Sequence, residues 1–281
     1  VGLREGKNRG IRRAMTEALS ATIHRSEPSD LADQDAVRVR PAGHPLVELT
    51  KARLSSMVLV TAGVGYLLAA TGPLDWVRFV WTLIGTALAA FGANALNQCL
   101  EVEQDLRMIR TRNRPIPAGR MTRKQATILG VALALVGPTL LLAEVGALPA
   151  GLALLTVILY VGVYTPLKRV SSINTLVGAV CGALPPMIGW AAVTGRLDAG
   201  AWVLGFLLFI WQIPHFLALA WMYRDDYARG GFRMLPLGDT DGTRTFNVAV
   251  LYTMALLPLG PLAAIHGVTG WPAAFGSVVL G

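Results

Sequence analysis

Three oxygen-bearing side chains, spaced four residues apart, follow a long apolar segment of the chain. They are Asn97, Glu101 and Asp105, and the apolar segment is residues 76–98. Because each residue of an α-helix advances by about 100°, side chains four apart lie on one stripe of the helix. Mg²⁺ is bound through oxygen and usually takes one or two carboxylates, leaving its other positions to water and substrate phosphates. This acid stripe therefore predicts a Mg²⁺ site.

Basic residues follow the acid stripe directly: Arg107, Arg110, Arg112, Arg114, Arg120, Arg123 and Lys124. Arginine holds phosphate oxygens in a bidentate fashion, so acids and bases together predict a diphosphate site. Pro115 and Pro117 predict that the helix ends there, because proline lacks the amide hydrogen that a helix needs. The alternative is that the bases only fix membrane topology and the acids are solvated. Acids beside an apolar span are costly to retain, which favours the metal site.

The composition indicates an all-α membrane protein. Of 281 residues, 53% are hydrophobic and only 15% are charged, which is far more apolar than a soluble domain. Apolar runs long enough to cross a bilayer are predicted at 54–72, 76–100, 125–143, 146–164, 173–193, 199–222 and 245–265, with an eighth beginning at Trp271. The sequence therefore predicts a polytopic helix bundle. The run from Trp271 is too short to span, so we expect the last helix to be missing.

Charge predicts the orientation and the domain limits. All of the 25 Lys and Arg residues except Arg78 and Arg196 precede the first span or lie in connections that end on one face. By the positive-inside tendency this face is cytoplasmic, in a multi-pass protein of the cell membrane. Residues 1–50 are polar and predict a flexible cytoplasmic arm, and residues 51–281 form the transmembrane domain. A net charge of +8 does not indicate nucleic acid binding here, because the bases lie between spans.

A second loop couples acids to bases after the sixth span. Asp225 and Asp226 stand between Arg224 and Arg229, directly after an apolar run, as the acid stripe does after the second span. Membrane folds built from repeats place their sites between the halves, so Asp226 is predicted to meet a second Mg²⁺ or the far side of the same diphosphate. Asp239 and Asp241, later in the loop, are predicted to be solvated.

The sixth span contains polar groups beside a proline. Pro214 leaves the Ile210 carbonyl without its usual partner, and Gln212 and His215 flank that break. These two side chains are candidates for lining a ligand pocket, and histidine is the usual protein ligand of haem iron. A hydrogen bond between helices is the alternative for both residues.

The acid stripe resembles the first acidic motif of the UbiA-type intramembrane prenyltransferases. Further stretches resemble the family's haem O synthase (protohaem IX farnesyltransferase) branch: RTRNRPIPAG from Arg110, YTPLKRVSSINTLVGAVCGALPPMIGWAA from Tyr164, WQIPHFLALAW from Trp211 and DYARGGFRMLP from Asp226. The resemblance covers Leu46 to Gly281. It implies nine transmembrane helices around a central cavity, about eight of them in this sequence. It also implies Mg²⁺-dependent transfer of farnesyl from farnesyl diphosphate to a vinyl group of haem B, with addition of water, giving haem O.

The resemblance assigns roles to individual residues. Metal binding and catalysis are implied for Asn97, Glu101, Asp105 and Asp226, catalysis for Lys168 and Arg169, and substrate binding for Arg110, Arg114, Arg229, Tyr164, Asn174, Gln212 and His215. Met222 stands where the family's second motif has another acid, and Glu101 stands where many relatives have Asp. The implied partners are farnesyl diphosphate, haem B and membrane lipid, with association expected with enzymes that use haem O, namely haem A synthase and a terminal oxidase.

Two alternatives remain open from the sequence. Another UbiA-type transferase would act on a quinone precursor or a chlorophyll-like acceptor. A transporter or a haem-binding membrane protein would use His215 and the proline-broken helices for conduction or storage. This last alternative gives no reason for the acid stripe.

Overall fold

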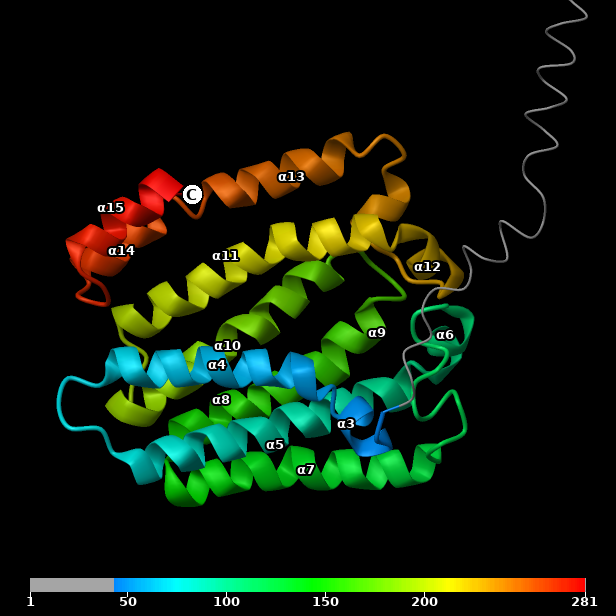
Figure 1. Cartoon of the computed structure of the whole chain (residues 1–281), viewed down its shortest axis with the longest axis horizontal. Helices are drawn as coiled ribbons and strands as arrows, with labels where there is room; N and C mark the ends of the chain where they lie inside the picture. Colours follow the sequence, from blue (N-terminus) through cyan, green and yellow to red (C-terminus); the bar gives the residue numbers. More distant parts are fainter. Residues whose placement is uncertain (1–42, 281) are drawn as a thin grey trace, which may run out of the picture. The chain divides into compact units, whose positions relative to one another are not determined.

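A computed structural model describes residues 43–280, which form helices and turns with no strand (Figure 1). The predicted all-α class is confirmed. Among the described residues, seven helical runs are long and apolar enough to cross a membrane: α4 (Ala52–Ala69), α5 (Trp76–Leu100), α7 (Arg123–Glu144), Ala147–Leu167, α10 (Asn174–Thr194), α11 (Ala199–Met222) and Thr243–Ile265. The chain is therefore an integral membrane protein. Residues 1–42 of the predicted arm lie outside the described part, and a first short helix, α3 (Pro45–Leu49), begins before residue 50.

Two of these runs are composite, and one further helix follows the last of them. Ala147–Leu167 consists of α8 (Ala147–Ile158), the π-helix η1 (Leu159–Tyr164) and α9 (Thr165–Leu167). Thr243–Ile265 consists of α13 (Thr243–Met254) and α14 (Leu259–Ile265). Turns at residues 255–258, which end with Pro258, separate the two helices. The helix predicted from Trp271 is α15 (Trp271–Leu280).

The helix that carries the acid stripe ends earlier than the sequence predicted. α5 stops at Leu100, and a short helix, α6 (Val102–Arg107), follows it. The segment 108–122 then consists of turns, so the prediction that the prolines end this helix is wrong. The chain has already left the helix at Met108, whose extended backbone caps α6. Pro115 therefore lies within the connection to α7.

α10 is the most buried of the spanning helices and packs against α4, α8 and α11. Small residues let its backbone touch that of α4. A Cβ added to Gly189 would lie 1.9 Å from the Ala62 carbonyl oxygen, and one added to Gly65 would lie 2.1 Å from the Pro186 carbonyl oxygen. Close approach at small residues is the usual way in which membrane helices associate. Pro185 and Pro186 are accommodated inside α10, which continues through both.

The polar connections gather at one end of the bundle, where α6 and α9 lie with the short helix α12 (Arg224–Arg229) (Figure 1). From there a loop containing η2 (Leu235–Gly238) leads to α13. Asp239 in this loop is buried, and its Oδ2 accepts hydrogen bonds from the backbone N and the Oγ1 of Thr245, both at 2.7 Å. These bonds hold the pKa of the Asp239 carboxyl below its ordinary value. The prediction that Asp239 is solvated is wrong, because it fixes the first turn of α13.

Candidate active site

The acid stripe is buried at the end of α5. Asn97, Glu101 and Asp105 are 0%, 3% and 0% exposed. The Glu101 amide donates to the Asn97 carbonyl at 3.0 Å, and the Asp105 amide donates to the Glu101 carbonyl at 2.8 Å. Helical hydrogen bonds thus cross the junction between α5 and α6, and the three side chains lie on successive turns as the sequence predicted. Buried carboxylates need charged partners, so their neighbours define the site.

Each member of the acid stripe contacts a basic side chain from a different element. Lys168 Nζ lies 2.9 Å from Glu101 Oε1. Arg114 Nη1 donates to both carboxylate oxygens of Asp105, at 2.8 and 2.7 Å. The third base is Lys51, at the start of α4, whose Nζ donates to Asn97 Oδ1 at 2.9 Å. Cations from α4, from the turn after α6 and from the end of α9 therefore converge on one helix end.

Lys51 was not predicted as a site residue. In the sequence it is one of many bases before the first span, and such bases normally indicate only topology. Its backbone is the local signal in the structure, because φ is 47°, the only positive φ of a non-glycine residue among residues 43–280. Strained conformations of this kind persist where the surrounding structure holds them, often at functional sites. α3 supplies that hold, since Gln98 of α5 donates to the backbone carbonyls of Glu48 and Leu49.

The charges at the site are strongly coupled. Burial, together with the charges of Arg114 and Lys168, lowers the pKa of Lys51 to about 7. Burial opposes ionisation of Glu101, but the positive charges of Lys168 and Lys51 outweigh it and lower the Glu101 pKa. Burial likewise opposes protonation of Lys168, and the negative charge of Glu101 outweighs it and raises the Lys168 pKa. Glu101 and Lys168 are therefore both charged at neutral pH.

The end of the π-helix η1 and the start of α9 place an aromatic ring and a hydroxyl group beside the acid stripe and its bases. The Lys168 ammonium lies 4.5 Å from the centre of the Tyr164 ring, within the range of a cation–π contact. A Cβ on Gly178 of α10 would come within 2.9 Å of that ring, so glycine there makes room for Tyr164. Thr165 Oγ1 accepts from Asn97 Nδ2 at 3.0 Å, which turns the amide oxygen of Asn97 toward Lys51. π-Helical turns are frequent at functional sites.

The second acidic loop joins the first through Asp226, which is buried in α12. Its Oδ1 accepts from the Ile109 amide at 2.8 Å, its Oδ2 accepts from the Arg110 amide at 3.3 Å, and Arg229 lies 3.4 Å from Oδ1. Spans α5 and α11 are each followed by a six-residue helix with acids in its first turn. The two loops predicted to act together are thus in contact, because the Asp226 carboxylate of the second loop accepts hydrogen bonds from backbone amides of the first.

The donor chemistry of the acid stripe fits Mg²⁺. One amide oxygen and two carboxylates are hard ligands, and Mg²⁺ rarely takes more from a protein. Within residues 43–280, however, no three His, Cys, Asp or Glu side chains stand close enough together to hold a metal ion. A metal site that gathers Glu101, Asp105 and Asp226 is therefore not formed in this arrangement. Asp226 holds the two loops together through the Ile109 and Arg110 amides, and its role at a metal stays a prediction.

Four of the predicted residues lie on α10, on α11 and in the loop between α11 and α13. Asn174 is buried and donates to the carbonyls of Ser171 and Arg233, at 2.6 and 2.9 Å, so it ties that loop to the start of α10. Gln212 of α11 is buried where a Cβ on Gly182 of α10 would lie 2.1 Å from its Oε1. His215 is exposed and stacks on Trp211, with 5.2 Å between ring centres. The fourth of these residues, Arg229 in the loop, lies 3.4 Å from Asp226 Oδ1.

Two predicted arginines point to different surroundings. The Arg110 guanidinium lies over the Tyr223 ring, 4.9 Å from its centre, beside Asp226. Arg169 follows Lys168 but is exposed, and it donates to the Leu100 carbonyl at the end of α5. Lys168 thus belongs to the buried site, whereas Arg169 faces a flank of the bundle.

The model of the UbiA prenyltransferase family matches residues 58–281. The chain belongs to the UbiA prenyltransferase family. Its UbiA-family relatives include proteins named protoheme IX farnesyltransferase. One from Solibacter usitatus is 42% identical over 84% of both chains, and one from Opitutus terrae is 47% identical over 80% of this chain and 76% of that one. The human mitochondrial protein of that name is 43% identical over 80% of this chain and 50% of its own length.

Solved structures share the UbiA fold at low sequence identity. A UbiA homolog from Archaeoglobus fulgidus bound to GPP and Mg²⁺ has a TM-score of 0.69 at 14% identity, covering 84% of this chain and 86% of that one. The apo structure of a UbiA homolog from Aeropyrum pernix K1 also has a TM-score of 0.69, at 16% identity, covering 81% and 84%. The helix bundle described above is therefore the UbiA fold.

Proposed function

We propose that this chain transfers the farnesyl group of farnesyl diphosphate to a vinyl group of haem B, with addition of water, giving haem O and diphosphate. The observation that carries the proposal is the buried acid stripe, paired with Lys168 and Arg114 at 2.9 and 2.7 Å. It occurs in a chain 42% and 47% identical to bacterial proteins named protoheme IX farnesyltransferase. The identity directs the choice of acceptor, and the site supplies the chemistry of the leaving group.

The acid stripe is the proposed Mg²⁺ site. Asn97, Glu101 and Asp105 would hold the ion, which when bound neutralises charge on a departing diphosphate. Lys168 and Arg114 are placed to donate to the oxygens that become more negative as the allylic carbon–oxygen bond breaks. Asp226, by fixing the backbone at Ile109 and Arg110, keeps the loop with Arg114 beside the acid stripe. The apolar helices shelter the allylic cation from premature water.

The acceptor is proposed to bind along α11. His215 and Trp211 form a stacked, exposed pair of flat rings, with 11° between their planes, and such a surface suits a porphyrin face. His215 would orient haem B there.

Arg110 and Arg229, at the junction of the two loops, are proposed to neutralise phosphate charge. Tyr164 would hold Lys168 in place.

The protein is proposed to lie in the cell membrane with the site end in the cytoplasm. All its Lys and Arg residues except Arg78 and Arg196 support this orientation through the positive-inside tendency. Within the described part, α6, α9 and α12 meet at that end of the bundle (Figure 1). Farnesyl diphosphate would then enter from the cytosol.

The acceptor is tested by the mass of the product. Membranes containing the chain are incubated with Mg²⁺, farnesyl diphosphate and either haem B or 4-hydroxybenzoate, and membranes lacking the chain serve as the control. We expect a hydroxyethylfarnesyl porphyrin in the first mixture and no prenylated product in the second. Prenylation of the aromatic acid would indicate a quinone-type transferase. Retention of haem B without pyrophosphate release would indicate a binding protein or a transporter.

A further inference from the structure

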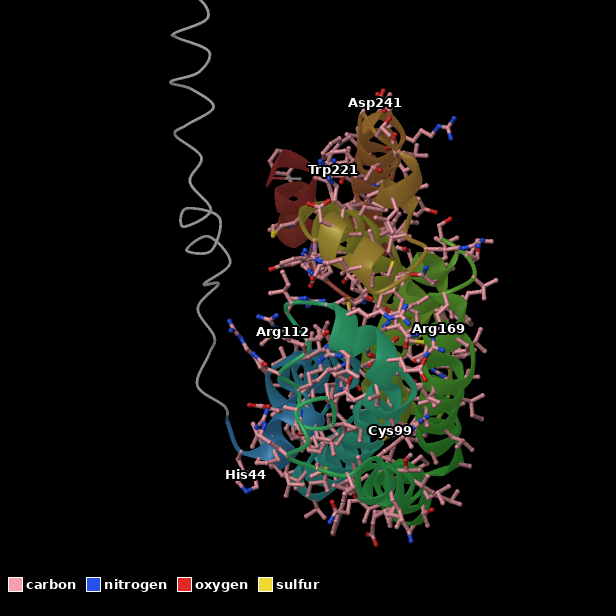
Figure 2. The ribbon with its side chains drawn as sticks, turned by 90° about the vertical axis from the view of Figure 1, so that its right-hand side faces the viewer. His44, Cys99, Arg112, Arg169, Trp221 and Asp241 are labelled. Atoms are coloured by element: carbon pink, nitrogen blue, oxygen red, sulfur yellow. The ribbon has the colours of Figure 1, made fainter. Side chains whose placement is uncertain are left out.

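A crevice on one flank of the site end is unused by the proposed reaction. We call it the flank crevice. It has a volume of about 280 Å³, and its lining includes three apolar side chains and three charged ones: Leu100, Val102, Pro166, Glu103, Arg123 and Arg169. Figure 2 looks onto this end of the bundle and shows Cys99, which also lines the crevice, and Arg169 toward one side, with Arg112 toward the other.

The flank crevice lies where three spans end. α5 ends at Leu100, α7 begins at Arg123, and the run through α9 ends at Leu167. The hydrocarbon core of a bilayer is about 30 Å thick, and the polar headgroups lie just beyond it. A hollow formed by the ends of spanning helices therefore lies at headgroup depth, with its apolar wall toward the acyl chains.

The charges of the flank crevice are unpaired. Within residues 43–280, neither arginine nor Glu103 takes part in any of the six ion pairs. Within the described part, the one hydrogen bond of the Arg169 guanidinium goes to the Leu100 carbonyl, from Nη2. Two guanidinium groups and one carboxylate face a common space, so a ligand with one anionic and one cationic group would complement them.

We propose that the flank crevice binds the headgroup of an aminophospholipid of the phosphatidylethanolamine type. Arg123 and Arg169 hold the phosphodiester, and Glu103 holds the ammonium group. Leu100, Val102 and Pro166 contact the glycerol and the first acyl carbons. A free phosphate would place its negative charge near the Glu103 carboxylate with no cation to pair with it. It would also leave the apolar wall of the crevice uncovered. This site is separate from the acid stripe, whose side chains are buried and already contact Lys51, Lys168 and Arg114.

Native mass spectrometry of the purified chain, released from nanodiscs of phosphatidylcholine with equal phosphatidylethanolamine, tests the proposal. We expect wild type to retain one phosphatidylethanolamine. The double variant Arg123→Gln/Arg169→Gln should retain about tenfold less, because it loses charge-assisted hydrogen bonds. Lys124→Gln is the matched control, since it removes the neighbouring positive charge without touching the crevice, and should retain the lipid as wild type does. Arg123→Lys/Arg169→Lys keeps both charges and should restore part of the retention.

The source of the phosphate and the role of the carboxylate are tested separately. Excess inorganic phosphate should leave the bound lipid in place, whereas displacement would indicate a simple anion site. In nanodiscs of equal phosphatidylethanolamine and phosphatidylglycerol, wild type should prefer phosphatidylethanolamine and Glu103→Gln should lose that preference. The proposal is overturned if the double glutamine variant retains the lipid as wild type does, or if Lys124→Gln loses as much. Each of these measurements concerns bound lipid only, so failure of the proposed farnesyl transfer would not affect it.

Discussion

Burial separates two adjacent basic residues that are alike in the sequence. Lys168 is drawn to Glu101, whose carboxylate cannot remain charged away from water without a partner, whereas Arg169 stays exposed. The pair fixes a donor beside the helix end where diphosphate would leave. Asp105 is held in the same way by Arg114. Contact with the acid stripe is therefore a better guide to function here than basic character.

Removing the Lys168 ammonium should impair turnover. We expect Lys168→Met to lower kcat by about 10²–10³, the range seen when one preorganised donor to a developing anion is lost. Lys168→Arg keeps the charge and should recover part of the rate. Arg224→Gln, an exposed residue paired with Asp225 at 3.8 Å, is the control and should turn over as wild type does. Steady-state kinetics at saturating substrates measure these effects, and an unaltered kcat for Lys168→Met would remove Lys168 from the mechanism.

Lys51 should give the metal-free protein a characteristic pH dependence. Its pKa is about 7 in the folded protein and 10.5 ordinarily, so between these values the unfolded chain binds a proton that the folded chain does not. The contribution of Lys51 to stability therefore rises with pH across this window. Thermal unfolding in EDTA should show the melting temperature of wild type rising relative to Lys51→Met from about pH 7 upward. Parallel pH profiles for the two proteins would contradict the lowered pKa.

Close backbone contact between α4 and α10 at Gly189 and Gly65 holds these two helices together. Gly189→Ala should destabilise the protein by about 1–3 kcal/mol, because an added Cβ lies 1.9 Å from the Ala62 carbonyl oxygen. Gly151→Ala in α8 is the matched control, since a Cβ there meets nothing within 4 Å. Its melting temperature should equal or slightly exceed that of wild type. Equal melting temperatures for the two variants would show that α4 and α10 are not in such close contact.

Across the whole molecule, the sequence predicts what depends on local pattern. Apolar length gives the spans closely: the second was predicted at 76–100 and α5 is Trp76–Leu100. The spacing of four residues correctly places Asn97, Glu101 and Asp105 on one stripe, because helical hydrogen bonds continue through Glu101. Proline was a poor guide to the helix end, since the turn at Met108 precedes Pro115. The helix ends at the extended backbone of Met108, upstream of both prolines.

Contacts between distant segments were less accessible to sequence reasoning. Lys51 lies 46 residues from Asn97 in the sequence. Its contact with Asn97 depends on a left-handed backbone conformation at Lys51, which the residue type does not predict. The sequence predicts Asp226 as a site residue, but it does not predict the hydrogen bond from the Ile109 amide, which joins residues 117 positions apart. Asp239 resembles a solvated loop acid in the sequence, yet it is buried and accepts a hydrogen bond from the Thr245 amide in the first turn of α13. Each of these depends on which loops fold over one another, and that information lies in the tertiary structure.

The acid stripe is proposed to drive the release of diphosphate with Mg²⁺. The most direct measurement is pyrophosphate release from farnesyl diphosphate in the presence of haem B, for wild type and Asp105→Asn, each with Mg²⁺ or with EDTA. We predict release only from wild type with Mg²⁺, with Asp105→Asn folded and inserted in the membrane but inactive. Equal release by Asp105→Asn, or by wild type in EDTA, would show that the acid stripe and Mg²⁺ do not drive the loss of diphosphate.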